Sequence, residues 1–378
     1  MNRKPLRILQ VNSRFNGGGV DNQTLNLSAG LLELGDSVTL AVGAGSRWEP
    51  RARQLKGRVE TYRPRSPFQS AAIRCWVRLI RRHDIQIIHA HQGNDYWPAV
   101  LAARLSGRGP RVVITRHLMT RPRFATRWGM LRLADMIAVS RAVEVVIRRE
   151  LRGPADRIHQ MNCGAETNLF LAARTPEVWQ FRERQDWPAD AIVFGVVGTF
   201  IAPRGKGQPE FLQAAARVHS QFPAARFVIV GEGSLKSALQ NQIGGLGLTR
   251  VARIIPFGEA IPVVMSALDA LVHPAVGTEA FGLVTIEALA SARPVIASRL
   301  DGIPEGFMEG DHGLLVPPGD VNALTQAMQT LAADEALRRR MGESGRVHVL
   351  ANFSREALAR RTHDLYIQLL ARGAAPTS

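Results

Sequence analysis

The chain has 378 residues, 46% of them hydrophobic and 21% charged, and this composition excludes a disordered, collagen-like or disulfide-scaffold protein. Its length favours two domains, and its two cysteines, Cys75 and Cys163, indicate a reducing compartment and argue against a structural zinc cluster. No apolar run reaches the roughly 18 residues of a membrane-spanning helix, and the run at 6–11 is too short and too polar for a signal peptide. We therefore expect a cytoplasmic protein.

The formal net charge of +16 is confined to the first part of the chain. Residues 1–170 contain 28 Lys or Arg against 12 Asp or Glu, whereas residues 171–378 contain 20 of each. Within the first part, residues 47–132 carry 19 basic and 4 acidic side chains. This asymmetry indicates a domain that faces a polyanion, a membrane surface or a phosphorylated substrate. Arginine use on solvated faces is the alternative, and it does not explain the confinement.

Short aliphatic runs alternate with helical stretches along the chain, which is the pattern of parallel sheets covered by helices. Strands are predicted at 6–11, 38–42, 85–89, 112–115, 136–139 and 158–162, and then at 192–197, 226–230, 254–257, 270–273, 294–297 and 314–316. This order predicts two doubly wound α/β domains, 1–170 and 171–356, with 167–190 as a linker and hinge. Two such domains would form a cleft at the carboxyl ends of their sheets, where open α/β proteins bind ligands.

A glycine loop follows the first predicted strand. Gly17, Gly18 and Gly19 precede a helical stretch at 23–34, so backbone N–H groups and the positive end of a helix dipole could approach a phosphate or a sugar. The spacing does not complete G-x-G-x-x-G, which disfavours a dinucleotide site. A plain tight turn is the alternative interpretation.

A second motif follows the predicted strand 270–273 and begins a helix that runs to residue 292. The free amides at 281–284 form an anion site, and Glu279 and Glu287 on either side could accept hydrogen bonds from hydroxyl groups. This arrangement fits a ligand that joins a diphosphate to polyhydroxylated ends, such as a nucleotide sugar. The alternative is a glutamate that favours the helix dipole and a second, exposed helical glutamate.

Two cations lie on a glycine-rich loop after the predicted strand 192–197. Arg204 and Lys206 suit a pyrophosphate, whose charge they would neutralise as it leaves. A mobile surface loop is the alternative. No D-x-D metal motif lies where a nucleotide-sugar site would need it, so we expect no metal and no cofactor.

These motifs, in this order, resemble glycosyltransferase family 4, whose members are retaining enzymes of the GT-B fold that use nucleotide-activated sugars. The resemblance covers nearly the whole chain and includes IIHAH at 87–91, ITRH at 114–117, NCGAETNLF at 162–170, the E-x7-E element at 279–287 and GLLVPPGD at 313–320. It implies two Rossmann-like domains that face each other across a cleft. It also implies a C-terminal helix, about 357–372, that crosses back onto the first domain.

The resemblance assigns roles in the second domain. Lys206, with Arg204, would hold the donor pyrophosphate, Glu279 would contact hydroxyls of the transferred sugar, and Glu287 would contact the ribose. The backbone of Phe281, Gly282 and Leu283 would line the phosphates.

In the first domain, the resemblance places Gly17 to Gly19 against the donor phosphates and the acceptor. His117 would project toward the reacting carbon, so that His117, Lys206 and Glu279 form the catalytic group. His89 and His91 are predicted to pack at a strand end. The family commonly has Arg after the glycine of the strand-end loop, but Thr199 follows Gly198 here, and Arg204 is the cation available to replace it.

The segment 68–82 is a candidate membrane-binding helix. It holds Ile73, Trp76, Val77 and Ile80 on one side and Arg74, Arg78 and Arg81 on another. A basic amphipathic segment can lie on an anionic bilayer, and a packed helix with solvated arginines is the alternative. With the Arg-rich stretch 108–132, it favours a membrane-bound or phosphorylated glycolipid acceptor. Lipopolysaccharide core or a related envelope glycan is the leading hypothesis, because several subgroups of the family that the chain resembles act there, with the inner face of the cytoplasmic membrane as the expected location.

Three other functions fit parts of the pattern. An enzyme of the same fold could act on a soluble small-molecule acceptor, and a degenerate relative could lack activity. A nucleic-acid-binding protein could use the basic region, but that region lacks a recognised motif and has few aromatic residues for base stacking. We therefore expect no nucleic-acid partner.

Overall fold

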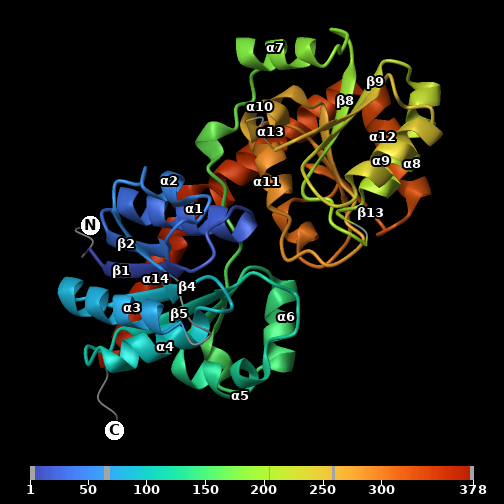
Figure 1. Ribbon diagram of the computed structural model, residues 1–378. Helices are drawn as coiled ribbons and strands as arrows, with labels where there is room; N and C mark the ends of the chain where they lie inside the picture. The colour runs from blue at the N-terminus through green and yellow to red at the C-terminus, as the bar shows by residue number, and fades with distance from the viewer. Residues whose placement is uncertain (1–4, 64–68, 204, 258–259, 375–378) are drawn as a thin grey trace. The chain divides into compact units, whose positions relative to one another are not determined.

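The computed structural model describes residues 5–63, 69–203, 205–257 and 260–374 (Figure 1). The chain divides into two compact units, one of residues 1–165 with 354–378 and the other of residues 166–353. The sequence analysis predicted the domain boundaries after residues 170 and 356, which is a few residues later in each case. Arg204 lies outside the described residues.

The first unit is built on a seven-stranded sheet in the order β3-β2-β1-β4-β5-β6-β7, and all of its neighbouring pairs are parallel. Its strands are β1 (Arg7–Asn12), β2 (Ser37–Gly43), β3 (Arg58–Tyr62), β4 (Ile87–Ala90), β5 (Arg111–Arg116), β6 (Asp135–Ala138) and β7 (Ile158–Gln160). Its helices are α1 (Gly19–Glu33), α2 (Glu49–Ala52), α3 (Ser70–His83), α4 (Tyr96–Leu105), α5 (Phe124–Leu133), α6 (Arg141–Glu150) and α14 (Arg355–Ala374).

The second unit has a six-stranded parallel sheet in the order β10-β9-β8-β11-β12-β13. Its strands are β8 (Ile192–Val197), β9 (Ala225–Val230), β10 (Ala252–Ile255), β11 (Ala270–His273), β12 (Val295–Ser298) and β13 (Gly313–Val316). Its helices are α7 (Pro176–Arg184), α8 (Gln208–Gln221), α9 (Lys236–Gly245), α10 (Ile261–Ala267), α11 (Leu283–Ala290), α12 (Val321–Ala333) and α13 (Glu335–Asn352). Both units are thus doubly wound α/β folds, as predicted.

Burial explains which strands the sequence revealed. The central strands are buried almost throughout, so their sequences are continuous apolar runs, as parallel strands covered on both faces require. Each predicted strand has a counterpart in the structure, shifted by a few residues at most. The edge strand β3 was not predicted, because its sequence RVETY is mostly polar and only Tyr62 is fully buried.

Helix α14 returns to the first unit, where Figure 1 shows it in red among the blue and cyan elements. It packs against α1, and a Cβ added to Gly30 of α1 would lie 2.7 Å from the Cβ of Ala359. A buried pair joins the same two regions, since His363 Nδ1 lies 2.8 Å from Asp36 Oδ2. The core of the first unit is therefore completed by the C-terminal helix.

The segment predicted as a linker, 167–190, lies entirely within the second unit, so its prediction as a linker was wrong. Three backbone carbonyls are held there: Phe170 O accepts from Arg346 Nη1 at 2.7 Å, Leu171 O from Ser266 Oγ at 2.8 Å, and Ala172 O from Arg293 Nη2 at 3.0 Å. Helix α7 follows at once. Its period was hidden because a charged residue, Arg182, occupies a buried position.

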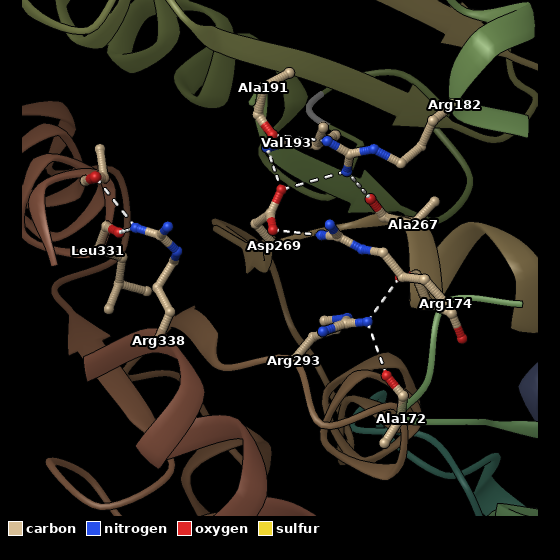
Figure 2. A network of polar contacts seen from close by, with 12 residues as sticks. Ala172, Arg174, Arg182, Ala191, Val193, Ala267, Asp269, Arg293, Leu331 and Arg338 are labelled. Carbon is tan, nitrogen blue, oxygen red and sulfur yellow. Dashed lines mark hydrogen bonds and ion pairs between the residues drawn. The ribbon is translucent and has the colours of Figure 1, made fainter. Parts of the chain in front are cut away.

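Asp269 fastens this segment to the sheet (Figure 2). Its Oδ1 accepts from Arg174 Nη2 at 2.5 Å, and its Oδ2 accepts from the Val193 amide at 2.8 Å and lies 3.4 Å from Arg182 Nη1. The Arg182 side chain is 2% exposed and also donates to the carbonyls of Ala267 and Ala191, both at 2.7 Å. One carboxylate therefore joins the entry to α7, α7 itself and strand β8.

We predict that Asp269→Ala lowers the free energy of unfolding by about 3–5 kcal/mol, because it leaves the buried Arg182 guanidinium without its counter-charge. Glu309→Ala is the control, since its partner Arg299 is 57% exposed and such surface pairs contribute about 0–1 kcal/mol. Urea unfolding measures both. Equal losses in the two variants would contradict this account of Asp269.

Candidate functional site

A close backbone contact brings two loops of the second unit together at the carboxyl edge of its sheet. Gly207 has φ +84°, and a Cβ at this position would lie 1.8 Å from the carbonyl oxygen of Pro274. The loop after β8 therefore lies against the loop after β11. As a result, Lys206 Nζ reaches Glu279 Oε2 at 2.6 Å.

The Glu279 carboxylate is largely buried and held by several groups. His273 Nε2 lies 3.5 Å from Glu279 Oε2, and the Glu279 amide donates to Asp301 Oδ2 at 3.0 Å. Burial by itself raises the pKa of Glu279, but the adjacent His273 ring and the Lys206 ammonium outweigh it and lower this pKa to about 2. The carboxylate is therefore ionised and able to accept hydrogen bonds.

Helix α11 begins beside this pair. Gly282 precedes it with φ +82°, a left-handed conformation that favours glycine, and the Thr285 amide donates back to the Gly282 carbonyl at 2.9 Å. The first amides of an α-helix have no intrahelical acceptor, so those at Leu283 and Val284 are available to an anion.

The remaining predicted residues of this motif lie in and next to the same helix. Phe281 is buried and packs against Phe353, with ring centroids 5.8 Å apart, while Leu283 is half-buried. Glu287 lies one turn inside α11 and is 8% exposed. The structure thus brings Lys206 and Glu279 into direct contact and places Phe281, Gly282, Leu283 and Glu287 along the start of one helix.

The glycine loop of the first unit is held by a buried aspartate. Gly17 and Gly18 have φ +108° and +116°, and α1 begins at Gly19. The Gly17 amide donates to Asp21 Oδ2 at 2.8 Å, and Asn12 Nδ2 donates to Asp21 Oδ1 at 2.8 Å. Burial raises the pKa of Asp21, against the effect of these hydrogen bonds. The sequence analysis missed Asp21, although its position four residues after Gly17 is a signal of such a contact.

His117 follows strand β5 in the same unit and is half-buried. Burial lowers the pKa of its imidazole to about 4, so the ring is neutral at pH 7. Its ring centroid lies 5.9 Å from that of His91.

The sequence analysis also missed His273 and Asp301 of the second unit, because only the folded loops bring these two residues to Glu279.

The basic surface of the first unit includes a hollow beside α3. Its volume is about 670 Å³, and it is lined by Ile73, Arg74, Val77, Arg78, Arg81, Arg82 and Leu105. Trp76 and Ile80, predicted on the apolar side, are fully buried, so that side packs in the core. Ile73 and Val77 are half-buried and remain beside the arginines.

Family models match both units. Residues 17–169 match the model "Glycosyltransferase Family 4", and residues 177–348 match the model "Glycosyl transferases group 1". With two parallel α/β sheets, these matches define a glycosyltransferase of the GT-B class. The chain belongs to the glycosyltransferases, with a family 4 domain followed by a group 1 domain.

Individual proteins are similar to this chain over different lengths. The lipopolysaccharide core biosynthesis glycosyltransferase LpsE of Rhizobium meliloti is 32% identical over 191 residues, 50% of this chain and 53% of that protein. The alpha-D-kanosaminyltransferase of Streptomyces kanamyceticus is 26% identical, over 71% of this chain and 69% of that enzyme. Thus the similarity to LpsE spans about half of that relative's length.

Solved structures show the same fold over almost the whole chain. The crystal structure of HepE from Anabaena in complex with UDP and glucose superposes with a TM-score of 0.82, at 20% identity, over 96% of this chain and 100% of that chain.

Within the residues that the structure describes, no helix combines the length and the apolar character needed to span a membrane. Nor do those residues place three or more His, Cys, Asp or Glu side chains where they could hold a metal ion.

We predict that Lys206→Met raises the pKa of Glu279 from about 2 toward the ordinary value of 4.5, because the variant removes the adjacent positive charge. A pH titration of carboxyl ¹³C shifts in glutamate-labelled protein measures this change. Lys236→Met, at an exposed position of the same unit, should leave this pKa at about 2.

The same pKa has a consequence for stability. In the wild type the unfolded chain binds the Glu279 proton more readily, so this carboxylate contributes stability above pH 4.5 that is lost as the pH falls toward 2. Lys206→Met should make the loss smaller. An unchanged pKa in the variant would mean that His273 and the local backbone alone hold the carboxylate ionised.

Proposed function

We propose that this protein moves a sugar from a nucleotide-sugar donor to a hydroxyl of an envelope glycan or glycolipid, with retention of the anomeric configuration and without a metal ion. The observation that carries the proposal is the Lys206–Glu279 ion pair beside the start of α11. A cation, helix-start amides and an ionised carboxylate are there together, and these groups suit the phosphates and the sugar hydroxyls of a diphosphate joined to a sugar.

On donor binding, Lys206 and Glu279 would contact different parts of the ligand. The diphosphate would take the Lys206 ammonium and the amides at the start of α11, and Arg204 would add a second cation. Glu279 would then accept hydrogen bonds from hydroxyls of the transferred sugar, and Glu287 from the ribose. The UDP and glucose in the HepE structure support a donor of this class.

The transfer step forms one bond and breaks one. The acceptor oxygen attacks the anomeric carbon from the face that the leaving group occupies, and the bond from that carbon to the phosphate oxygen breaks. The electron pair stays on the diphosphate, where Lys206 and the helix amides stabilise the charge, and the acceptor proton passes to the departing phosphate. In this proposal the glycine loop, Gly17 to Gly19, abuts the donor phosphates and the acceptor, and His117 lies near the reacting carbon.

We predict that one class of nucleotide sugar, among UDP-, GDP- and ADP-glucose, raises the melting temperature of the protein. Binding to the native state alone contributes about 2.7 kcal/mol of stability at a ligand concentration 100 times the Kd. Glu287→Ala should abolish the shift, whereas Glu309→Ala, an exposed glutamate of the same unit, should keep it. If none of the donors shifts the wild type, the proposed donor site is wrong.

The acceptor proposal rests on the surface of the first unit. The similarity to LpsE supports a lipopolysaccharide-type acceptor, and the arginines around the α3 hollow support one that carries negative charge. Helix α5 adds an exposed aromatic pair, Phe124 and Trp128, which are 74% and 54% exposed with ring centroids 6.1 Å apart. Aromatic side chains among arginines are typical of surfaces that bind at the interface of an anionic membrane.

We predict that the protein sediments with vesicles of equal parts phosphatidylcholine and phosphatidylglycerol, but not with phosphatidylcholine alone, and that salt weakens this binding. Phe124→Ser with Trp128→Ser should reduce it, whereas Val347→Ser, an equally exposed apolar residue of the second unit, should not. Failure to bind at low salt would favour a soluble acceptor. Retention on a DNA duplex, with no response to nucleotide sugars, would favour a nucleic-acid-binding protein.

A further inference from the structure

A row of polar side chains lies on one inner face of the first unit's sheet. Gln10 of β1 is in register with His89 of β4, so their side chains point to the same face, and His91 shares it because side chains alternate along a strand. Thr115 of β5 is on the same face and approaches His89. Helix α14 covers this face and contributes Tyr366.

These side chains form a linear chain of hydrogen bonds that begins at Thr115 and ends at His91. The two nitrogens of His89 lie 2.6 Å from the Tyr366 hydroxyl and 2.7 Å from Thr115 Oγ1. Gln10 Nε2 donates to the Tyr366 hydroxyl at 3.4 Å, and Gln10 Oε1 lies 2.7 Å from His91 Nε2. Burial lowers the pKa of His89 to about 3 and that of His91 well below its usual range, so both rings are neutral.

With the Gln10 amide oriented as in this structure, Nε2 toward Tyr366 and Oε1 toward His91, the hydrogen bonds assign the proton of His91. A neutral imidazole carries one N–H, and the partner of Nε2 is the Gln10 carbonyl oxygen, which can only accept. His91 Nε2 therefore carries the hydrogen, and Nδ1 has a lone pair. That Nδ1 is buried and has no hydrogen-bond partner among the described residues, which is a costly state for a polar atom.

A small cavity is lined by both His91 and His117. It has a volume of about 20 Å³, and its other lining residues include the polar His89 and Thr115 and the apolar Ile137 and Leu358. His117 Nε2 is likewise buried without a partner among the described residues. The ring centroids of His91 and His117 are 5.9 Å apart. A cavity of this size holds about one water molecule where polar partners exist, and the two unpartnered ring nitrogens would supply them among otherwise mainly apolar neighbours.

We propose that His91 is a positioning residue for His117: one water in this cavity accepts a hydrogen bond from His117 Nε2–H and donates one to His91 Nδ1. His117 is then held as the Nε2–H tautomer, with Nδ1 as its basic nitrogen. All of these hydrogen bonds then point the same way. His117 donates to the water and the water donates to His91. His91 donates to Gln10, which donates to the Tyr366 hydroxyl. The inference rests on the proposed function only in assuming that His117 acts at the reacting centre.

Long-range ¹H–¹⁵N NMR of histidine-labelled protein reads the tautomer of each ring directly. We expect Nε2–H for both His91 and His117 in the wild type. In His91→Gln, the amide reaches toward Gln10 but no acceptor remains at the Nδ1 position, so His117 should populate both tautomers. In His91→Asn, an amide oxygen near the Nδ1 position should restore the Nε2–H form.

Transfer kinetics of the same variants separate positioning from stability. We expect kcat of His91→Gln to fall by about tenfold or more, within the roughly 10⁴-fold that a wrong tautomer costs a catalytic histidine, with KM of the donor unchanged and partial recovery in His91→Asn. The matched control is Val347→Ser in the second unit, which should alter neither the tautomer nor kcat. Amide spectra show that each variant is folded.

Two results would overturn the inference: an Nδ1–H tautomer of His117 in the wild type, or an unchanged His117 tautomer in folded His91→Gln. A shifted tautomer with an unchanged kcat would overturn the role of His91 in transfer. A wild type that shows the expected tautomers but transfers no sugar would contradict the proposed function, while the hydrogen-bond order in the first unit would be upheld.

Discussion

The candidate donor site depends on a backbone contact that only glycine allows. Gly207 and the Pro274 carbonyl are so close that any Cβ would separate the loops after β8 and β11. Without that contact, Lys206 would not reach Glu279, and only the His273 ring would remain to offset the penalty of burying the carboxylate. The position of the ion pair is therefore set by the approach of two main chains, and the helix amides at α11 add to a charge arrangement already in place.

The two units place polar groups at the carboxyl edge of a parallel sheet in different ways. The second unit uses opposite charges, Lys206 and Glu279, which stabilise each other and, in the proposed function, separate to bind the two parts of the donor. The first unit uses neutral rings, His89, His91 and His117, of which His89 and His91 are held by hydrogen bonds to uncharged partners. A charged pair suits recognition of a diphosphate, whereas ordered neutral rings suit a place where the direction of one hydrogen bond matters.

Much of this fold could be predicted from sequence because buried parallel strands are read as continuous apolar runs. Strand β3 could not, since an edge strand is partly solvated and its sequence, RVETY, is mostly polar like that of a loop. Helix α7 was hidden because Arg182 is buried, and a charge is stable there only beside Asp269, 87 residues away along the chain. The candidate site shows the same difference between what local sequence reveals and what only long-range contacts create. Local motifs indicated Lys206 and Glu279, but the contact of His273 with Glu279 exists only in the folded loops.

The place of α14 has a consequence for synthesis on the ribosome. The first unit emerges in two pieces, because residues 354–378 follow the whole of the second unit. Until they emerge, the core formed by Ile8, Leu27 and their neighbours lacks Leu358, Tyr366 and Leu369, and its apolar surface is exposed. The second unit is continuous and can fold before the first one is complete. A premature stop near the C-terminus would therefore leave the first unit open and prone to aggregate, although most of its own chain had been made long before.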